Sequence, residues 1–430
     1  MDRTARLGIQ LSTAVAAVMV VAGCSSSTTS PMARPLASVS STSMSAPAPP
    51  VAPPVAAQEA AGEVPWNTVG AGWTLATWSP VTAHRPGEQR EPGEADPETA
   101  TTTLFLVNPA GIRYRITTLA GADARLRLTD WSGAGGTALL TSTEYPGPSK
   151  IIAVDLHTGT QTVIPAQGDP SFTRPTGQAL LVSTPFMGAT PGTLTRIALD
   201  GTVQQNYPTA DLGGVGQFSG RYLATPDGTR LVLATANLGN DLVPRSDDSL
   251  VVVGNDGTIL RTVPTPMANA DCAPVRWWAA EVVLARCSAE HGAATQLWRV
   301  PIDGGTPTPL TALNSGQGDD PGFGGDLGDG SAWELPSGMF LQSTGACGTA
   351  FLSRLTADGH TTRVHVPGMS DSVFVVGATG DKLVLQGHLG CGGGTALVSY
   401  DPAVNSSTVL LGPSVNGGSV TEALPYPGQS

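Results

Sequence analysis

The sequence is poor in charged and aromatic residues. Charged residues make up 13% of the 430 residues and aromatic residues 5%, and lysine occurs only at Lys150 and Lys382. Long amphipathic helices need a charged face, so this composition excludes a helical bundle. The formal net charge of −12 repels a phosphate backbone, so we expect no nucleic acid among the partners.

Local motifs of the common enzyme classes are also missing. The sequence contains no G-x-S-x-G nucleophile elbow, no H-E-x-x-H metal motif, no phosphate-binding loop and no dinucleotide fingerprint in a βαβ setting. The hydrolase domain that accompanies some propellers is therefore not indicated. A site assembled from several distant segments leaves no such motif, so an enzyme stays as an alternative.

Glycine (53 residues) and proline (36 residues) are abundant, and they punctuate a repeat. A pair of strands joined by a turn, usually of the Asp-Gly type, recurs seven times. The pairs are Thr103–Leu119, Ile151–Pro165, Leu194–Pro208, Leu250–Pro264, Gln296–Leu310, Phe351–Pro367 and Leu397–Leu411. A period of roughly 40–50 residues with four strands per unit predicts the blades of a β-propeller.

A second signature precedes each of these hairpins, and it consists of a turn followed by an apolar strand. Examples are Asp130–Ser142 (DWSGAGGTALLTS) and Ala224–Thr235 (ATPDGTRLVLAT). Together the two hairpins predict an all-β, seven-bladed β-propeller, with six or eight blades as alternatives. One further strand, Gly418–Tyr426, follows the seventh blade, and we expect it to add to the first blade and close the ring.

The N-terminus predicts export and lipid attachment. Arg3 and Arg6 precede the apolar run Leu7–Val21, which is shorter than the roughly 20 residues of a membrane-spanning helix. The run ends in Val-Ala-Gly-Cys, which resembles a bacterial lipobox with Cys24 as the lipidated residue, expected to carry diacylglycerol and palmitate. The alternative is an ordinary signal peptide beside a chance cysteine.

Three segments follow from this interpretation. Residues 1–23 form the lipoprotein signal peptide, and residues 24–63 form a Ser/Ala/Pro-rich tether that cannot bury a core. Residues 64–426 form the propeller. We expect a monomer on the extracytoplasmic face of the cell membrane, held there by its lipid.

Four cysteines remain after Cys24, and an even number in an exported protein predicts two disulfides. Cys272 and Cys287 lie symmetrically about a turn, so they should face each other across one hairpin. Cys347 and Cys391 hold matching positions in consecutive repeats. We therefore favour the pairs 272–287 and 347–391 among three connectivities, with a structural zinc site as the alternative.

The segment Asn314–Ser331 (NSGQGDDPGFGGDLGDGS) is rich in glycine and aspartate. Carboxylate oxygens on a flexible loop suit Ca²⁺, which makes Asp319, Asp320, Asp326 and Asp329 weak candidate ligands. Their spacing matches neither an EF-hand nor a nonapeptide repeat. We therefore predict a solvated connection between blades five and six, and no cofactor.

The repeat resembles that of TolB-like β-propellers, most closely in ATPDGTRLVLAT, while DWSGAGGTALL keeps the Trp-Ser of that pattern. The opening Val64–Pro80 (VPWNTVGAGWTLATWSP) is similar to the start of TolB-like lipoproteins of actinobacteria. The resemblance spans about Val64 to Tyr426 and implies propeller geometry. TolB itself carries an α/β domain before its propeller, and here the tether occupies that place.

Two functions are consistent with these features. The first is a lipid-anchored binding or scaffold module that presents a loop face to an envelope protein or glycan, without catalysis. The second is a propeller enzyme of the lactonase, lyase or glycan hydrolase type, with carboxylates and a metal at the central channel.

Overall fold

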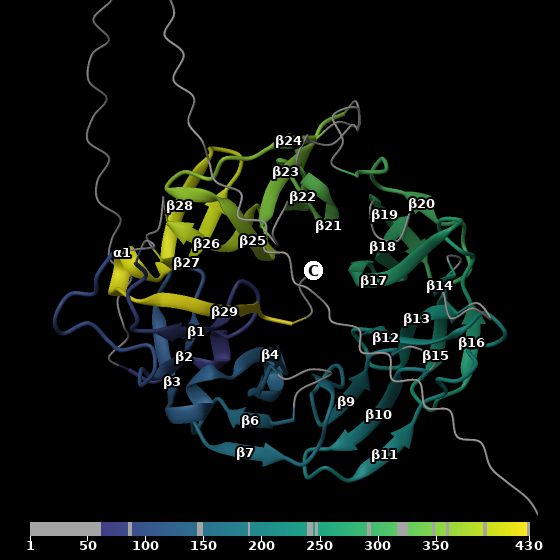
Figure 1. The fold of residues 1–430 in the computed structure, drawn as a ribbon, viewed down its shortest axis with the longest axis horizontal. Helices are drawn as coiled ribbons and strands as arrows, with labels where there is room; N and C mark the ends of the chain where they lie inside the picture. Colours follow the sequence, from purple (N-terminus) through teal and green to yellow (C-terminus); the bar gives the residue numbers. More distant parts are fainter. Residues whose placement is uncertain are drawn as a thin grey trace, which may run out of the picture. The chain divides into compact units, whose positions relative to one another are not determined.

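The computed structural model describes eleven stretches of the chain. They are residues 62–84, 88–143, 149–187, 190–238, 244–245, 248–289, 294–315, 326–345, 349–357, 361–389 and 394–427. Within them, seven antiparallel sheets lie around a common centre (Figure 1), each with a main path of four strands. The prediction of a seven-bladed β-propeller is confirmed.

The blades follow one another along the chain. Blade one contains β29 (Ser419–Pro425), β1 (Thr74–Ser79), β2 (Thr102–Val107) and β3 (Arg113–Leu119). Blade two contains β4 (Arg127–Trp131), β5 (Thr137–Thr141), β6 (Ile151–Asp155) and β7 (Gln161–Ile164). Blade three contains β8 (Asp169–Phe172), β9 (Ala179–Thr184), β10 (Thr193–Ala198) and β11 (Val203–Asn206).

Blade four contains β12 (Gln217–Ala224), β13 (Arg230–Leu238), β15 (Leu250–Gly254) and β16 (Ile259–Thr262), with the short β14 (Pro244–Arg245) beside β13. Blade five contains β17 (Ala270–Ala279), β18 (Val282–Ala289), β19 (Ala294–Pro301) and β20 (Thr308–Pro309). Blade six contains β21 (Asp326–Leu335), β22 (Gly338–Gly345), β23 (Ala350–Leu355) and β24 (Thr361–Arg363). Blade seven contains β25 (Met369–Thr379), β26 (Lys382–Leu389), β27 (Thr395–Asp401) and β28 (Ser406–Leu411).

Within the described stretches, helical structure consists of four short segments. Three 3-10 turns span Trp66–Thr68, Gly121–Arg125 and Gly133–Gly135, and the helix α1 spans Pro413–Asn416. In the described part of the chain, no helix has the length and apolar character needed to cross a bilayer.

The core is divided among the gaps between neighbouring blades. One cluster joins Leu104 of blade one to Trp131 of blade two, and another joins Val232 of blade four to Val283 of blade five. Equivalent apolar clusters fill the other five gaps. Each blade is therefore stabilised chiefly by its two neighbours, so the first and last blades must also pack together.

The last strand provides that closure. β29 pairs antiparallel with β1, with Leu75 opposite Leu424, and lies at the inner end of blade one (Figure 1). Val420 of β29 is 2% exposed and packs in one cluster with Phe105 of blade one and Leu397 of blade seven. The predicted closing strand is confirmed, and it also becomes the innermost strand of its blade.

The two predicted hairpin signatures occupy fixed places in the blades. The seven Asp-Gly-type hairpins form the third and fourth strands, and in blades two to seven the upstream signature forms the turn between the first and second strands. In blade four that turn contains Gly228, whose φ is +71°. A Cβ there would lie 1.8 Å from the carbonyl oxygen of Arg174, so only glycine allows the turns of blades three and four to meet.

Candidate functional site

A pocket of about 440 Å³ lies where the first strands of blades one to five end. The residues that line it are Ser132, Gly133, Ala134, Arg174, Pro175, Leu223, Ala224, Pro226, Val275, Arg276, Trp277, Tyr426 and Pro427. They belong to β12, to β17, or to the residues that directly follow β4, β8, β12 and β29. We call this site the axial pocket, because these strands surround the centre of the ring (Figure 1).

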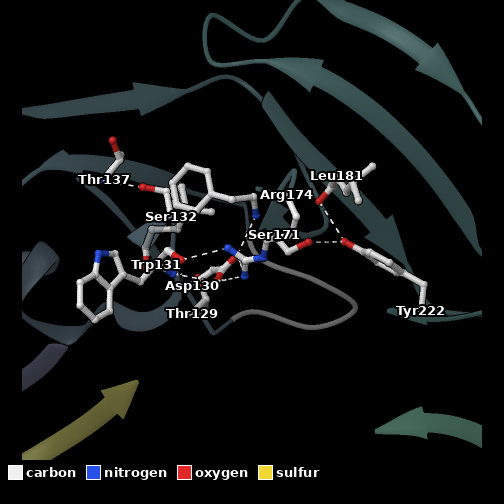
Figure 2. Close-up of polar contacts among 11 residues, drawn as sticks. Thr129, Asp130, Trp131, Ser132, Thr137, Ser171, Arg174, Leu181 and Tyr222 are labelled. Atoms are coloured by element: carbon white, nitrogen blue, oxygen red, sulfur yellow. Dashed lines mark hydrogen bonds and ion pairs between the residues drawn. The ribbon is translucent and has the colours of Figure 1, made fainter. Parts of the chain in front are cut away.

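Arg174 is held in the pocket wall by Asp130 of the neighbouring blade (Figure 2). The Arg174 Nη2 donates to Asp130 Oδ1 at 2.9 Å, and Nη1 donates to the carbonyl oxygen of Trp131 at 3.1 Å. Asp130 also accepts hydrogen bonds from the backbone amides of Trp131 and Phe172, both at 2.7 Å. The carboxylate therefore joins blade two to blade three and neutralises the charge of Arg174.

Tyr222 continues this network into blade four (Figure 2). Its hydroxyl donates to the carbonyl oxygen of Leu181 at 3.2 Å and lies 2.6 Å from Ser171 Oγ, which can donate to it. Burial raises the pKa of Tyr222 far above its usual range, so the hydroxyl stays protonated. Tyr222 acts as a structural donor between blades rather than as a base.

Arg276 is the second cation of the pocket, and its surroundings differ. Its Nη1 donates to the carbonyl oxygen of Ala332 at 2.7 Å, and its guanidinium lies 5.2 Å from the ring centroid of Trp333. Burial lowers its pKa to about 10, because charge is disfavoured away from water. Arg276 is still cationic at neutral pH, and among the described residues no carboxylate forms an ion pair with it.

Two aromatic residues fix the apolar walls. Trp277 is 8% exposed, and its Nε1 donates to the carbonyl oxygen of Ala224 at 2.7 Å. The ring of Tyr426 meets that of Trp131 edge to face, with the centroids 5.2 Å apart. The backbone amide of Tyr426 donates to the carbonyl oxygen of Trp73 at 2.8 Å. These contacts hold both rings in place before any ligand arrives.

The lining offers binding groups rather than a catalytic set. Among the described residues, the lining contains two guanidinium groups, several apolar side chains and no carboxylate, histidine or cysteine. The hydroxyl of Ser132 already accepts a hydrogen bond from the backbone amide of Thr137 at 2.9 Å. Such walls suit an organic molecule with an apolar body and a negative charge.

No protein-family model and no curated protein matches the sequence. Solved structures do resemble the fold. The β-propeller domain of the trilobed protease from Pyrococcus furiosus is 11% identical, with a TM-score of 0.46 over 80% of this chain and 93% of that one. The periplasmic gluconolactonase of Pseudomonas aeruginosa is 13% identical, with a TM-score of 0.44 over 81% and 98%. A putative TolB from Agrobacterium tumefaciens is 15% identical, with a TM-score of 0.36 over 59% and 84%.

The predicted disulfide within blade five is present. Cys272 of β17 faces Cys287 of β18 in the strand register, and the two sulfur atoms are bonded. Both residues are buried. Cys24, Cys347 and Cys391 lie outside the described residues, so the lipid site and the second disulfide stay predictions.

The aspartate-rich segment is only partly described. Asp319 and Asp320 lie outside the described residues, and Asp326 begins β21. Asp329 also lies in β21 and is 1% exposed, and its Oδ1 accepts from Ser343 Oγ at 3.0 Å and from Asn314 Nδ2 at 3.4 Å. Among the described residues, no three His, Cys, Asp or Glu side chains are grouped as metal ligands would be.

The interpretation of this whole segment as a solvated connection is wrong for residues 326–331. They form the start of β21, the innermost strand of blade six. The register is irregular between Asp326 and Asp329 and again between Asp329 and Ser331, and Gly328 has a φ of +116°. A strand with these bulges carries glycine and aspartate instead of alternating apolar residues.

Proposed function

We propose that this protein is a lipid-anchored, extracytoplasmic β-propeller that binds an envelope protein or glycan through the axial pocket and does not catalyse a reaction. The observation that carries the proposal is the lining of that pocket. The lining residues that the structure describes combine preordered aromatic walls with two arginines, and no nucleophile paired with a base is among them. The anchored location is inferred from Cys24 and the segment before it.

The alternative of a propeller enzyme requires several carboxylates or histidines that converge near the ring centre. In the described stretches no group of three such residues forms. Asp130 pairs with Arg174 of the pocket wall, and its oxygens also accept hydrogen bonds from two backbone amides. A carboxylate engaged in this way serves the fold and is poorly placed for proton transfer.

Site-specific photocrosslinking in the native cell tests the binding face. A benzophenone amino acid is placed at Ala134, an exposed residue at the pocket rim, and in a matched variant at Val163, which is 61% exposed on the outer strand of blade two. We expect Ala134 to capture a defined partner that Val163 does not capture. The same products from both positions, or none from Ala134, would contradict the proposal.

Detergent-phase partitioning tests the anchor. The native chain should enter the detergent phase, and Cys24→Ser should stay in the aqueous phase because it has no thiol to lipidate. Ser26→Ala is the matched control, which should partition like the native chain. Equal partitioning of the native chain and Cys24→Ser would exclude lipidation at Cys24.

A further inference from the structure

Arg276 has no acidic partner among the described residues, unlike the partly buried Arg174 and Arg230. Arg174 pairs with Asp130, and Arg230 pairs with Glu281 through two contacts of 2.7 and 3.0 Å. Arg276 instead has a neutral carbonyl and the face of Trp333. An unpaired, partly desolvated cation costs stability, and a negatively charged ligand would remove that cost.

The overall charge makes this cation more notable. The chain carries a formal net charge of −12, yet the pocket lining contains two arginines and no acidic residue. Asp130 neutralises Arg174 from behind the wall. The pocket is therefore left with about one uncompensated positive charge, which one singly charged anion would balance.

The remaining walls define the rest of the ligand. Leu223, Val275, Trp277 and Tyr426 supply aliphatic and aromatic surface to the same pocket as Arg276. The volume of about 440 Å³ lies within the roughly 300–1,000 Å³ that is typical of sites for small organic molecules. A doubly charged phosphate would need more donors than this lining leaves open, whereas a carboxylate fits one guanidinium.

We propose that the axial pocket binds an organic carboxylate, with its carboxyl group paired to Arg276 and its apolar body against Trp277 and Tyr426. This inference rests on the proposed function, because it names the chemistry that the binding face recognises. The carboxylate would belong to a free small molecule or to the end of a larger envelope component. Both sources share the group that Arg276 contacts.

Isothermal titration calorimetry with defined probes tests the inference. The probes are the phenylalkanoates from phenylacetate to 6-phenylhexanoate, their neutral amides, phenyl phosphate and glucuronate. We expect at least one phenylalkanoate to bind at least tenfold more tightly than its own amide. The amide keeps the shape of the acid and removes the charge, so this ratio measures the contribution of the anion.

Two variants assign the effect to one guanidinium. Arg276→Met should weaken the acid at least tenfold and leave the affinity for the amide unchanged, which also shows that the pocket is still folded. Arg354→Met is the matched control, because Arg354 also lies over a ring, that of Phe340 at 5.9 Å, and donates to a carbonyl, that of Ser337. Arg354 is exposed and lies outside the pocket. Arg354→Met therefore removes one positive charge from the chain and should leave the affinity for the acid unchanged.

Each other outcome overturns the inference. Equal affinity for acid and amide, an equal loss in both variants, or tighter binding of phenyl phosphate or glucuronate would each show that the pocket does not select apolar carboxylates. If no probe binds while Ala134 still captures its partner, the carboxylate inference fails and the proposed function stands. If Ala134 captures nothing, the proposed function itself fails.

Discussion

The closing strand makes the sharpest test of the fold, because a single substitution addresses it. Val420→Asp places a carboxylate in the apolar seam between Phe105 of blade one and Leu397 of blade seven. Burying a valine contributes roughly 1.5–3 kcal/mol, and an unpaired buried charge costs roughly 3–5 kcal/mol. We therefore expect the free energy of unfolding to fall by roughly 3–5 kcal/mol or more. The loss would be smaller only if β29 detached from the ring before the rest of the chain unfolded.

The expected change in melting temperature follows from the size of the propeller. At about 2.1 cal/mol/K per residue, a unit of about 360 residues has an unfolding entropy of about 0.8 kcal/mol/K. A loss of roughly 3–5 kcal/mol then lowers the melting temperature by roughly 4–7 °C. Detachment of β29 would also expose β1 as a free edge, so size-exclusion chromatography should show self-association.

The matched control is Val203→Asp, at a position that is 58% exposed on the outer strand β11. It adds the same charge to the same residue type, and its cost should be within about 0.5 kcal/mol. Differential scanning calorimetry measures both variants against the native chain. If the melting temperature of Val420→Asp lies within about 1 °C of that of the control, β29 does not stabilise the ring as we infer.

Three further predictions concern the disulfide of blade five, the carboxylate that joins blades two and three, and a turn of blade four. Cys272 and Cys287 are 15 residues apart in the sequence, and replacing both by alanine removes the covalent link between them. The free energy of unfolding should fall by about 3 kcal/mol and the melting temperature by about 4 °C. A melting temperature equal to that of the native chain would contradict this prediction. Asp130→Ala removes the acceptor of hydrogen bonds from two backbone amides and one guanidinium. Urea unfolding should show that the free energy of unfolding falls by about 2–4 kcal/mol. An unchanged free energy of unfolding would show that the carboxylate is not needed for stability. Hydrogen bonds, led by that of the Thr225 hydroxyl, lower the pKa of Asp227 from 3.8 to about 2. Above pH 3.8, the native chain should therefore have a higher free energy of unfolding than Asp227→Asn, and this difference should vanish as the pH falls through about 2. A difference in the free energy of unfolding that persists below about pH 2 would contradict this prediction.

The architecture could be predicted because each blade repeats the same local demands. Tight turns between paired strands need residues that accept a positive φ, and the repeated Asp-Gly pairs supply them. Gly257, with a φ of +86°, occupies such a turn in blade four. The closing strand was recognisable as well, because Gly418–Tyr426 is a strand pattern without a partner in its own repeat.

The axial pocket could not be predicted, because its residues come from five blades that are distant in the sequence. Arg174 lies in the turn that follows β8, whereas Arg276 lies within β17. The turn of blade three has Arg174 at the position that Thr225 occupies in blade four. A charged residue at one copy of a repeated turn was the one sequence feature that could have indicated a site there. That the two arginines line one pocket depends on the packing of the ring, which no local pattern encodes.

The position of β29 has a consequence for biosynthesis. Tyr426 and Pro427 follow this strand and line the same pocket as Ser132 and Arg174, which are made more than 250 residues earlier. A nascent or prematurely terminated chain can form the middle blades, yet it has no complete pocket until its final strand has been translated and has docked. If the axial pocket binds a ligand as proposed, binding requires that β29 has docked, and the bound ligand would in turn hold β29 in place.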